Sequence, residues 1–233
     1  MIWKKNKIIF IHIPKCGGTS IENSINLIEK GMYWGQNRVI AKRINFFYEL
    51  QHMPYVSYKK LVKDIDNFYI FTFVRNPFDR VISLYKDTKY KRHDLRKKLN
   101  LKDNFSFYEF LKKIKNSKHI HHKSQTFFLD GKKDSKIKVF KFENFEKNFI
   151  HILKQNKLST KLRKSNQSKK DSIIESKLKY YNDKKNIYLV KSIFKDDLRM
   201  FDYSYEDFKK SQKNVFLKKV KNFIIRKINN IKF

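Results

Sequence analysis

Cysteine, proline and glycine are all scarce in this sequence of 233 residues, which contains one, three and five of them. The single cysteine, Cys16, cannot form an internal disulfide, so we expect a reducing compartment. No apolar run is long enough to span a bilayer, and no secretory signal pattern precedes the first apolar segment. These absences predict a cytoplasmic protein, with peripheral contact at the inner membrane as an open alternative.

Acidic residues are also few. Lys and Arg number 55 against 22 Asp and Glu, which gives a net charge of +33. A field of this sign attracts polyanions, which include nucleic acid, acidic glycans, nucleotides and anionic lipid. Hydrophobic residues make up 40% and aromatic residues 16% of the chain, so a packed core can form and the composition is not that of a disordered protein.

Short apolar runs alternate with amphipathic segments along the chain. Strands are expected at 8–13, 68–74 and 138–142, and a helix is expected after each of them. Strands that alternate with helices form parallel sheets covered by helices, so the sequence predicts a single α/β domain with a mostly parallel central sheet flanked by helices. We expect this domain to span residues 1–208 and a basic amphipathic helix to span 209–233.

The first expected strand runs into the loop PKCGGTS, residues 14–20, which opens a helix. A P-loop-like strand-loop-helix of this kind suits phosphate, because loop N–H groups and the helix dipole converge on an anion. The alternative is an ordinary tight turn in which Thr19 caps the helix, with Glu22 completing a capping box. The candidate binding residues are Lys15, Cys16, Gly17, Gly18, Thr19 and Ser20.

The second expected strand ends in RNPFDRVIS, residues 75–83. Asn76 can cap the helix that follows, since Pro77 takes its first position. Arg75 offers a bidentate fork to a phosphate, and Ser83 lies eight residues further on. The alternatives are an ion pair between Arg75 and Asp79, and a bond from Ser83 to a helix carbonyl.

Taken together, the two loops resemble the nucleotide-binding elements of sulfotransferases that use 3′-phosphoadenosine 5′-phosphosulfate (PAPS). The resemblance is greatest to carbohydrate sulfotransferases of the 2-O- and chondroitin type and to their small bacterial relatives. It implies that the loop at 14–20 binds the 5′-phosphosulfate and that Arg75 and Ser83 bind the 3′-phosphate. It covers residues 8–205, with weaker similarity in the segments 124–129, 140–145, 164–168 and 196–203.

The segment QHMPY, residues 51–55, is similar to the family's Gly-His-x-Pro-Tyr segment, although Gln51 stands where the family has glycine. The resemblance implies that His52 is the general base that takes a proton from the acceptor hydroxyl. Lys15 would stabilise the bridging oxygen of the leaving group. The implied co-substrate is PAPS, and no metal is expected.

The lysine of the first loop precedes the glycines, whereas a Walker A loop has its lysine after them. A phosphate-loop kinase is therefore the less favoured enzyme, and a non-enzymatic polyanion-binding module is the third alternative. The expected acceptor is an acidic or neutral glycan or a glycolipid rather than nucleic acid. The sequence leaves open which acceptor it is, which position is sulfated and the oligomeric state.

A run of histidines, His119, His121 and His122, lacks the helical spacing of a zinc site. We expect these residues in a solvated basic loop, with contacts to the acceptor as the alternative. At the other end of the chain, residues 213–233 combine an apolar helical stripe with a basic remainder. Such a helix suits the surface of an anionic membrane, or it packs on the domain or on a second subunit.

Overall fold

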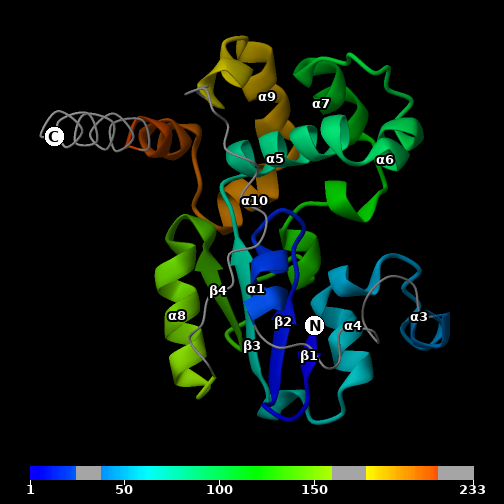
Figure 1. The fold of residues 1–233 in the computed structure, drawn as a ribbon, viewed down its shortest axis with the longest axis vertical. Coiled ribbons are helices and arrows are strands. Elements are labelled where there is room, and N and C mark those ends of the chain that lie inside the picture. Colours follow the sequence, from blue (N-terminus) through cyan, green and yellow to red (C-terminus); the bar gives the residue numbers. More distant parts are fainter. Residues whose placement is uncertain (25–37, 159–176, 215–233) are drawn as a thin grey trace, which may run out of the picture.

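The computed structural model describes residues 1–24, 38–158 and 177–214 (Figure 1). Its strands are β1 (Ile2–Trp3), β2 (Ile8–Ile11), β3 (Tyr69–Val74) and β4 (Ile137–Lys141). Its helices are α1 (Gly18–Ser24), α3 (Arg38–Ile44), α4 (Tyr55–Leu61), α5 (Pro77–Tyr90), α6 (His93–Lys98), α7 (Phe107–Lys115), α8 (Phe145–Gln155), α9 (Lys184–Ile193) and α10 (Lys195–Met200). The predicted α/β architecture is confirmed.

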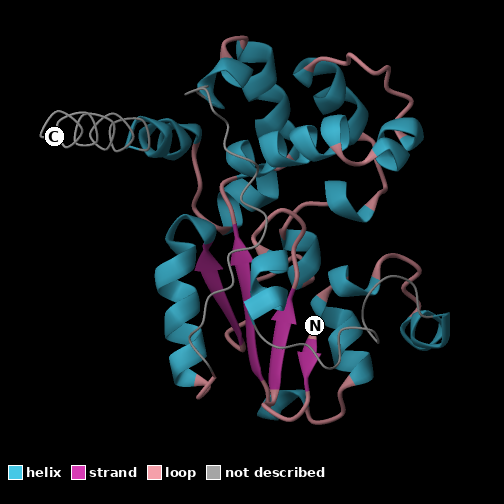
Figure 2. Ribbon diagram, in the orientation of Figure 1, coloured by secondary structure: helices cyan, strands magenta, loops and turns pink. Residues whose placement is uncertain are grey.

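The sheet has the order β1-β2-β3-β4, and β2, β3 and β4 pair in parallel (Figure 2). The strand β2 consists of four buried apolar residues, as expected for a strand covered on both faces. The sequence did not predict β1, which pairs antiparallel with β2 along only two residues. A two-residue strand has no periodicity that a sequence pattern could register.

The described residues form two hydrophobic cores. One surrounds the sheet and includes Phe10 and Phe71, whose rings stack 5.1 Å apart. The other joins α5, α7 and α9 and includes Phe78 and Phe110. In Figure 1 the helices α5, α6, α7 and α9 gather beyond the carboxyl ends of β2, β3 and β4. The loops that leave these strand ends therefore lie between the sheet and the helical layer.

Two local predictions fared differently. Asn76 caps α5, because its side chain accepts a hydrogen bond from Phe78 N and Pro77 takes the first position, as predicted. The predicted capping box of Thr19 and Glu22 is wrong. The helix α1 begins at Gly18, so Thr19 lies inside it, and the Glu22 carboxylate points inward to the His12 ring instead.

Residues 205–214 form the last described helix, and the buried Phe208 anchors it in the helical core. The boundary predicted after residue 208 thus falls within this helix. Most of the predicted amphipathic segment lies outside the described residues, as does the segment 164–168. Among the residues that the structure describes, no helix combines the length and apolarity that crossing a bilayer would need.

Candidate active site

The loop after β2 depends on both of its glycines for packing. Gly17 has a φ of +87°, and a Cβ there would lie 2.7 Å from the Phe142 ring. A Cβ on Gly18 would lie 2.0 Å from Nε2 of His12. Lys15 also adopts a left-handed φ, of +67°, which is costly for a residue with a side chain. The close approach that the glycines permit is thus made by the protein's own side chains.

Lys15 is paired with a carboxylate of the helix that follows the second loop. Its Nζ lies 3.1 Å from Oδ1 of Asp87, and both side chains are largely buried. Burial lowers the pKa of Lys15, and the adjacent Asp87 opposes that shift. The sequence did not predict this partner, although Asp87 stands one helical turn beyond Ser83 on α5.

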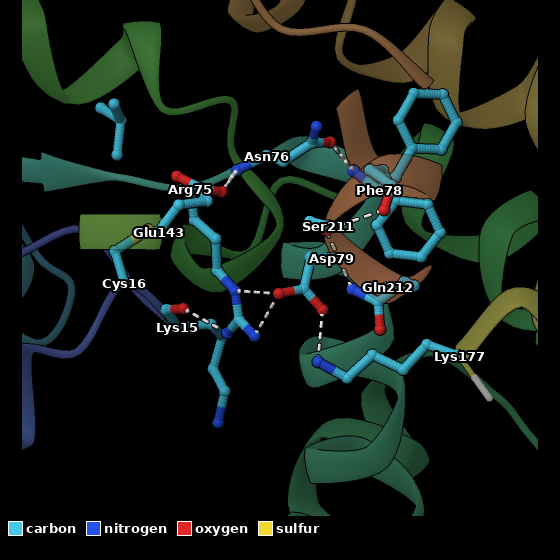
Figure 3. A network of polar contacts seen from close by, with 12 residues as sticks. Lys15, Cys16, Arg75, Asn76, Phe78, Asp79, Glu143, Lys177, Ser211 and Gln212 are labelled. Carbon is cyan, nitrogen blue, oxygen red and sulfur yellow. Dashed lines mark hydrogen bonds and ion pairs between the residues drawn. The ribbon is translucent and has the colours of Figure 1, made fainter. Parts of the chain in front are cut away.

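Arg75 is held in the same way, by Asp79. Its Nε and one Nη donate to Asp79 Oδ2 at 2.9 and 2.7 Å, and its other Nη donates to the Lys15 carbonyl at 3.1 Å (Figure 3). Lys177 adds a second cation to Asp79, 2.7 Å from its Oδ1. Burial raises the pKa of Asp79, but Arg75 and Lys177 outweigh burial and lower it below its usual value. The Arg75–Asp79 pair given above as an alternative is therefore present, and the bond from Arg75 to the Lys15 carbonyl joins the two loops.

Ser83 lies on α5 between these two carboxylates. The spacing of four residues puts Asp79, Ser83 and Asp87 on one face of the helix, and the outer two contact the loops. Ser83 is half-buried, and the described contacts include no direct bond between Ser83 and Arg75. Thr19 and Ser20 are half-buried in the first turn of α1. The predicted phosphate-binding residues therefore come from two adjacent strand ends and from the helices that follow them.

The Arg75 backbone is fixed by the segment at 124–129. Oε1 of Gln125 accepts from Arg75 N at 2.8 Å, and Nε2 of Gln125 donates to Arg75 O at 2.9 Å. The buried Asp197 in turn accepts from Gln125 N at 2.8 Å. The Gln125 side chain thus pairs with both the N–H and the carbonyl of Arg75, as the backbone of a neighbouring strand would.

A second clamp comes from the segments at 140–145 and 196–203. The Glu143 carboxylate accepts from Asn76 N at 2.9 Å and from the Tyr203 hydroxyl at 2.7 Å. Two of the four segments with weak similarity to sulfotransferases therefore contact the second loop directly, and the segment at 196–203 holds those two in place. The fourth lies outside the described residues.

His52 lies in the single turn Leu50–His52 and is buried against the first loop. Its Nδ1 lies 2.9 Å from the carbonyl oxygen of His12, and a carbonyl only accepts, so Nδ1 carries the proton. In the neutral imidazole this leaves the lone pair on Nε2. The two rings meet edge to face with their centroids 4.4 Å apart. His52 therefore has the tautomer that a general base acting through Nε2 needs.

The side chain of Glu49 faces this nitrogen. Its Oε2 lies 3.7 Å from His52 Nε2 and 2.9 Å from His121 Nε2. The hydrogen bond with His121 lowers the pKa of Glu49, with a further contribution from Arg92. In the described part of the chain, ligand atoms of Glu49, His52 and His121 lie within 4.8 Å of one another, an arrangement that could hold a divalent cation.

Burial dominates the protonation of His52. Desolvation lowers its pKa well below 6.5, and the nearby His12 and His121 lower it further. His52 is therefore neutral at physiological pH.

Burial likewise raises the pKa of the Cys16 thiol to about 12, and Cys16 bonds to the Gln125 side chain at 3.3 Å. A buried thiol with a raised pKa is a poor nucleophile, so Cys16 fills space in the loop.

Arg80 ties the two sides of the site together. Its side chain is fully buried and donates to Pro14 O at 3.0 Å, to His121 O at 3.2 Å and to Lys123 O at 3.0 Å. The first of these carbonyls belongs to the glycine loop and the other two to the histidine segment. The sequence analysis missed this residue, although an arginine inside an otherwise apolar helix face is a visible signal.

The expectation of a solvated loop at 119–122 is wrong. His121 and His122 are only 6% and 4% exposed, and His119 is half-buried. Desolvation lowers the pKa of His119 to about 4 and that of His122 to about 3. The apolar neighbour Ile120 is also buried, which draws the turn against the core.

His12 and Glu22 were also missed. His12 directly follows β2, and its Nδ1 lies 2.7 Å from the buried carboxylate of Glu22. The signal available in the sequence was a histidine at a strand end, ten residues before an acidic residue in the next helix. Histidine and glutamate are not part of a recognised phosphate-loop pattern, so only the structure reveals that His12 and Glu22 pair.

These features define an α/β protein with cationic loops at the carboxyl ends of adjacent parallel strands and a neutral, oriented histidine beside them. A family model described as the sulfotransferase family matches residues 1–204. The chain therefore belongs to the sulfotransferase family, whose enzymes transfer sulfuryl groups. Comparisons with curated proteins and with solved structures gave no significant match.

Proposed function

We propose that the protein transfers the sulfuryl group of PAPS to a hydroxyl group of a carbohydrate acceptor, a glycan or a glycolipid. Family membership favours sulfuryl transfer over the kinase and over the non-enzymatic polyanion-binding module. The donor would bind at the carboxyl ends of β2 and β3. The 14–20 loop would hold the 5′-phosphosulfate, and Arg75 and Ser83 would hold the 3′-phosphate.

The charge of the donor site supports an anionic ligand. Lys15 and Arg75 approach the same point from two loops, since an Nη of Arg75 donates to the Lys15 carbonyl. Each cation is paired with a carboxylate of α5 in this structure, so a polyphosphate would compete with Asp87 and Asp79 for them. The net charge of +33 favours the more highly charged competitor.

The proposed reaction has three parts. His52 Nε2 takes the proton of the acceptor hydroxyl as its oxygen forms a bond to sulfur. The bond between sulfur and the bridging oxygen of the 5′-phosphate breaks, and the electron pair stays on that oxygen. Lys15 stabilises the charge that develops there, and 3′,5′-ADP leaves. The Glu49 carboxylate, 3.7 Å from His52 Nε2, would stabilise the imidazolium that forms.

One observation carries this assignment. The segment after β2 holds Lys15 in its loop and, through the carbonyl of His12, also orients His52 at 2.9 Å. A single short stretch of backbone thus fixes the positions of the proposed base and of the residue for the leaving group. Such positioning is the main contribution that an enzyme makes to group transfer of this kind.

The direct test is transfer of radiolabelled sulfate from PAPS to a panel of neutral and acidic oligosaccharides and glycolipids. We expect labelled saccharide and release of 3′,5′-ADP, and we expect Lys15→Ala to abolish both. Arg75→Ala should mainly weaken the binding of 3′,5′-ADP. Tight binding of ATP with Mg²⁺, and none of 3′,5′-ADP, would contradict the proposal.

Membrane contact through residues 209–233 stays a proposal from the sequence, because residues 215–233 are outside the described part. Truncation for its test should follow Asn214, since Phe208 is buried in the helical core. We expect the full chain to float with anionic vesicles at low salt and the truncated chain to float less. Equal flotation of the two chains would contradict a membrane role.

A further inference from the structure

A cavity of 460 Å³ lies between α6, α7 and the histidine turn. Its size is typical of sites for small ligands. Neither Lys15 nor Arg75 lines it, so it is separate from the proposed donor site. The side chains that matter for its chemistry are Tyr48, Lys98, Lys113, Lys118, His119 and His122.

The cavity adjoins the proposed base on two segments of the chain. On one segment, Tyr48 directly precedes Glu49, whose Oε2 lies 3.7 Å from His52 Nε2. On the other, His119 and His122 flank His121, whose ring centroid is 4.9 Å from that of His52. The cavity therefore lies next to the residues that contact the proposed base.

The cavity has the composition of a site for an anion attached to a ring. Lys98, Lys113 and Lys118 line it and are solvent-exposed, and none of the residues that line it is acidic. Tyr48, Leu95 of α6 and Leu99 directly after α6 supply an aromatic and aliphatic wall. Sugars that carry a carboxylate or a sulfate combine such a charge with apolar C–H faces.

The histidine turn forms one wall of the cavity and is held in place by Ser117. The Ser117 hydroxyl accepts from His119 N at 3.2 Å and lies 2.7 Å from His122 Nδ1. The two histidines that line the cavity are therefore fixed by the residue at its rim.

We propose that this cavity binds an acidic unit of the saccharide acceptor through its carboxylate or sulfate group. The unit bound here would neighbour the one that receives the sulfuryl group. This inference rests on the proposed function for the identity of the acceptor. The site itself rests on the lysines, the absence of acidic lining residues and the aromatic and aliphatic wall.

Binding is tested by calorimetry, which needs neither PAPS nor turnover. The probes are a uronate-containing tetrasaccharide, the same tetrasaccharide with its carboxylates reduced to alcohols, and a sulfated neutral tetrasaccharide. The last two arms separate carboxylate from sulfate as the bound group. The variant is Lys98→Ala/Lys113→Ala, and the matched control is Lys97→Ala/Lys112→Ala. The control removes the same charge from the adjacent positions of α6 and α7, which do not line the cavity.

We expect the Lys98/Lys113 variant to raise the Kd for an acidic tetrasaccharide about tenfold and the control to change it less than twofold. The reduced tetrasaccharide should bind weakly to all three proteins. Equal losses in both variants would assign the binding to the general charge of the protein and overturn the proposal. So would equal affinity for the acidic and reduced probes. Absence of sulfate transfer from PAPS would overturn the proposed function alone, because the calorimetric comparison decides the cavity independently.

Discussion

The donor side and the histidine side of the site use opposite electrostatics. On the donor side the cations Lys15 and Arg75 are each paired with an aspartate of the same helix. On the histidine side desolvation lowers the pKa of His52 well below 6.5 and that of His122 to about 3, so the rings are neutral. A ligand on the donor side must therefore displace the aspartates from the cations. A ligand on the histidine side meets uncharged donors and acceptors.

The two sides suit different steps. A polyphosphate carries enough charge to compete with a carboxylate for a cation. A histidine that acts as a base, as proposed for His52, must be neutral before it takes a proton, and burial favours that state. The sides touch where the His12 ring packs beneath Gly18 and where Arg80 bonds to both segments. Substitutions at these contacts should affect both sides together.

The largest effect is expected for Gly18→Ala, which acts at the contact between the sides. The new Cβ would lie 2.0 Å from His12 Nε2, so the ring must move, and the carbonyl that orients His52 belongs to the same residue. We expect a loss of about 1–3 kcal/mol in the free energy of unfolding and loss of most of the turnover. Thermal denaturation measures the loss of stability, and the sulfate-transfer assay measures the loss of turnover.

Gly131→Ala is the matched control for this substitution. Nothing lies within 4 Å of a Cβ at Gly131, but its φ is +73°. This variant should lose about 1 kcal/mol through backbone strain alone and keep its turnover. Wild-type turnover in Gly18→Ala would mean that the two sides are not coupled through His12.

The next effect concerns the histidine side alone. His52→Ala should lower turnover by about 10²-fold or more and change the Kd for 3′,5′-ADP less than twofold. The exposed His151 on α8 provides the control, and His151→Ala should leave both quantities unchanged. If His52→Ala stays active while Glu49→Gln does not, the base is Glu49.

The sequence predicted the local structure of the two loops better than the packing of the histidine side. The loops at 14–20 and 75–83 are local strand-loop-helix units, and local hydrogen bonding and capping determine their shape, as the Asn76 cap demonstrates. The rings of His52 and His121 contact each other although the two residues lie 69 positions apart in the sequence. This contact depends on packing of the whole chain. Gln51 in place of glycine did not prevent this, because Gln51 is itself buried in the turn.

A smaller effect tests the neutrality of the histidine side. In the unfolded chain a histidine has a pKa of about 6.5, whereas in the folded protein that of His122 is about 3 and that of His119 about 4. Between pH 6.5 and these values only the unfolded chain binds the protons, so the free energy of unfolding should fall as the pH is lowered. His122→Asn should reduce this slope by up to about 1.4 kcal/mol per pH unit. Parallel pH profiles for His122→Asn and wild type would mean that His122 titrates normally in the folded protein.

Turnover, like the free energy of unfolding, should fall as the pH is lowered. Because burial, His12 and His121 lower the pKa of His52, its protonation should limit turnover only below pH 6.5. The acidic limb of kcat/KM measures this, because kcat/KM reports the pKa values of the free enzyme. An acidic limb of kcat centred above pH 6.5 would indicate that a carboxylate such as that of Glu49 raises the pKa of His52 once the acceptor has bound.

The smallest effect tests the paired charges of the donor side. In the structure Asp87 holds the Lys15 ammonium at 3.1 Å, so nucleotide binding must share or displace this contact. Asp87→Asn removes the competing charge but keeps the shape of the side chain, and it should tighten 3′,5′-ADP binding roughly threefold. A double-mutant cycle with Lys15→Ala isolates the pair, because the gain from Asp87→Asn should disappear once Lys15 is absent. The gain should also shrink as salt is added, since ions screen the charges of partly exposed groups. Weaker binding in Asp87→Asn would show that Asp87 positions Lys15 for the nucleotide, and the two sides of the site would then differ less than their charges suggest.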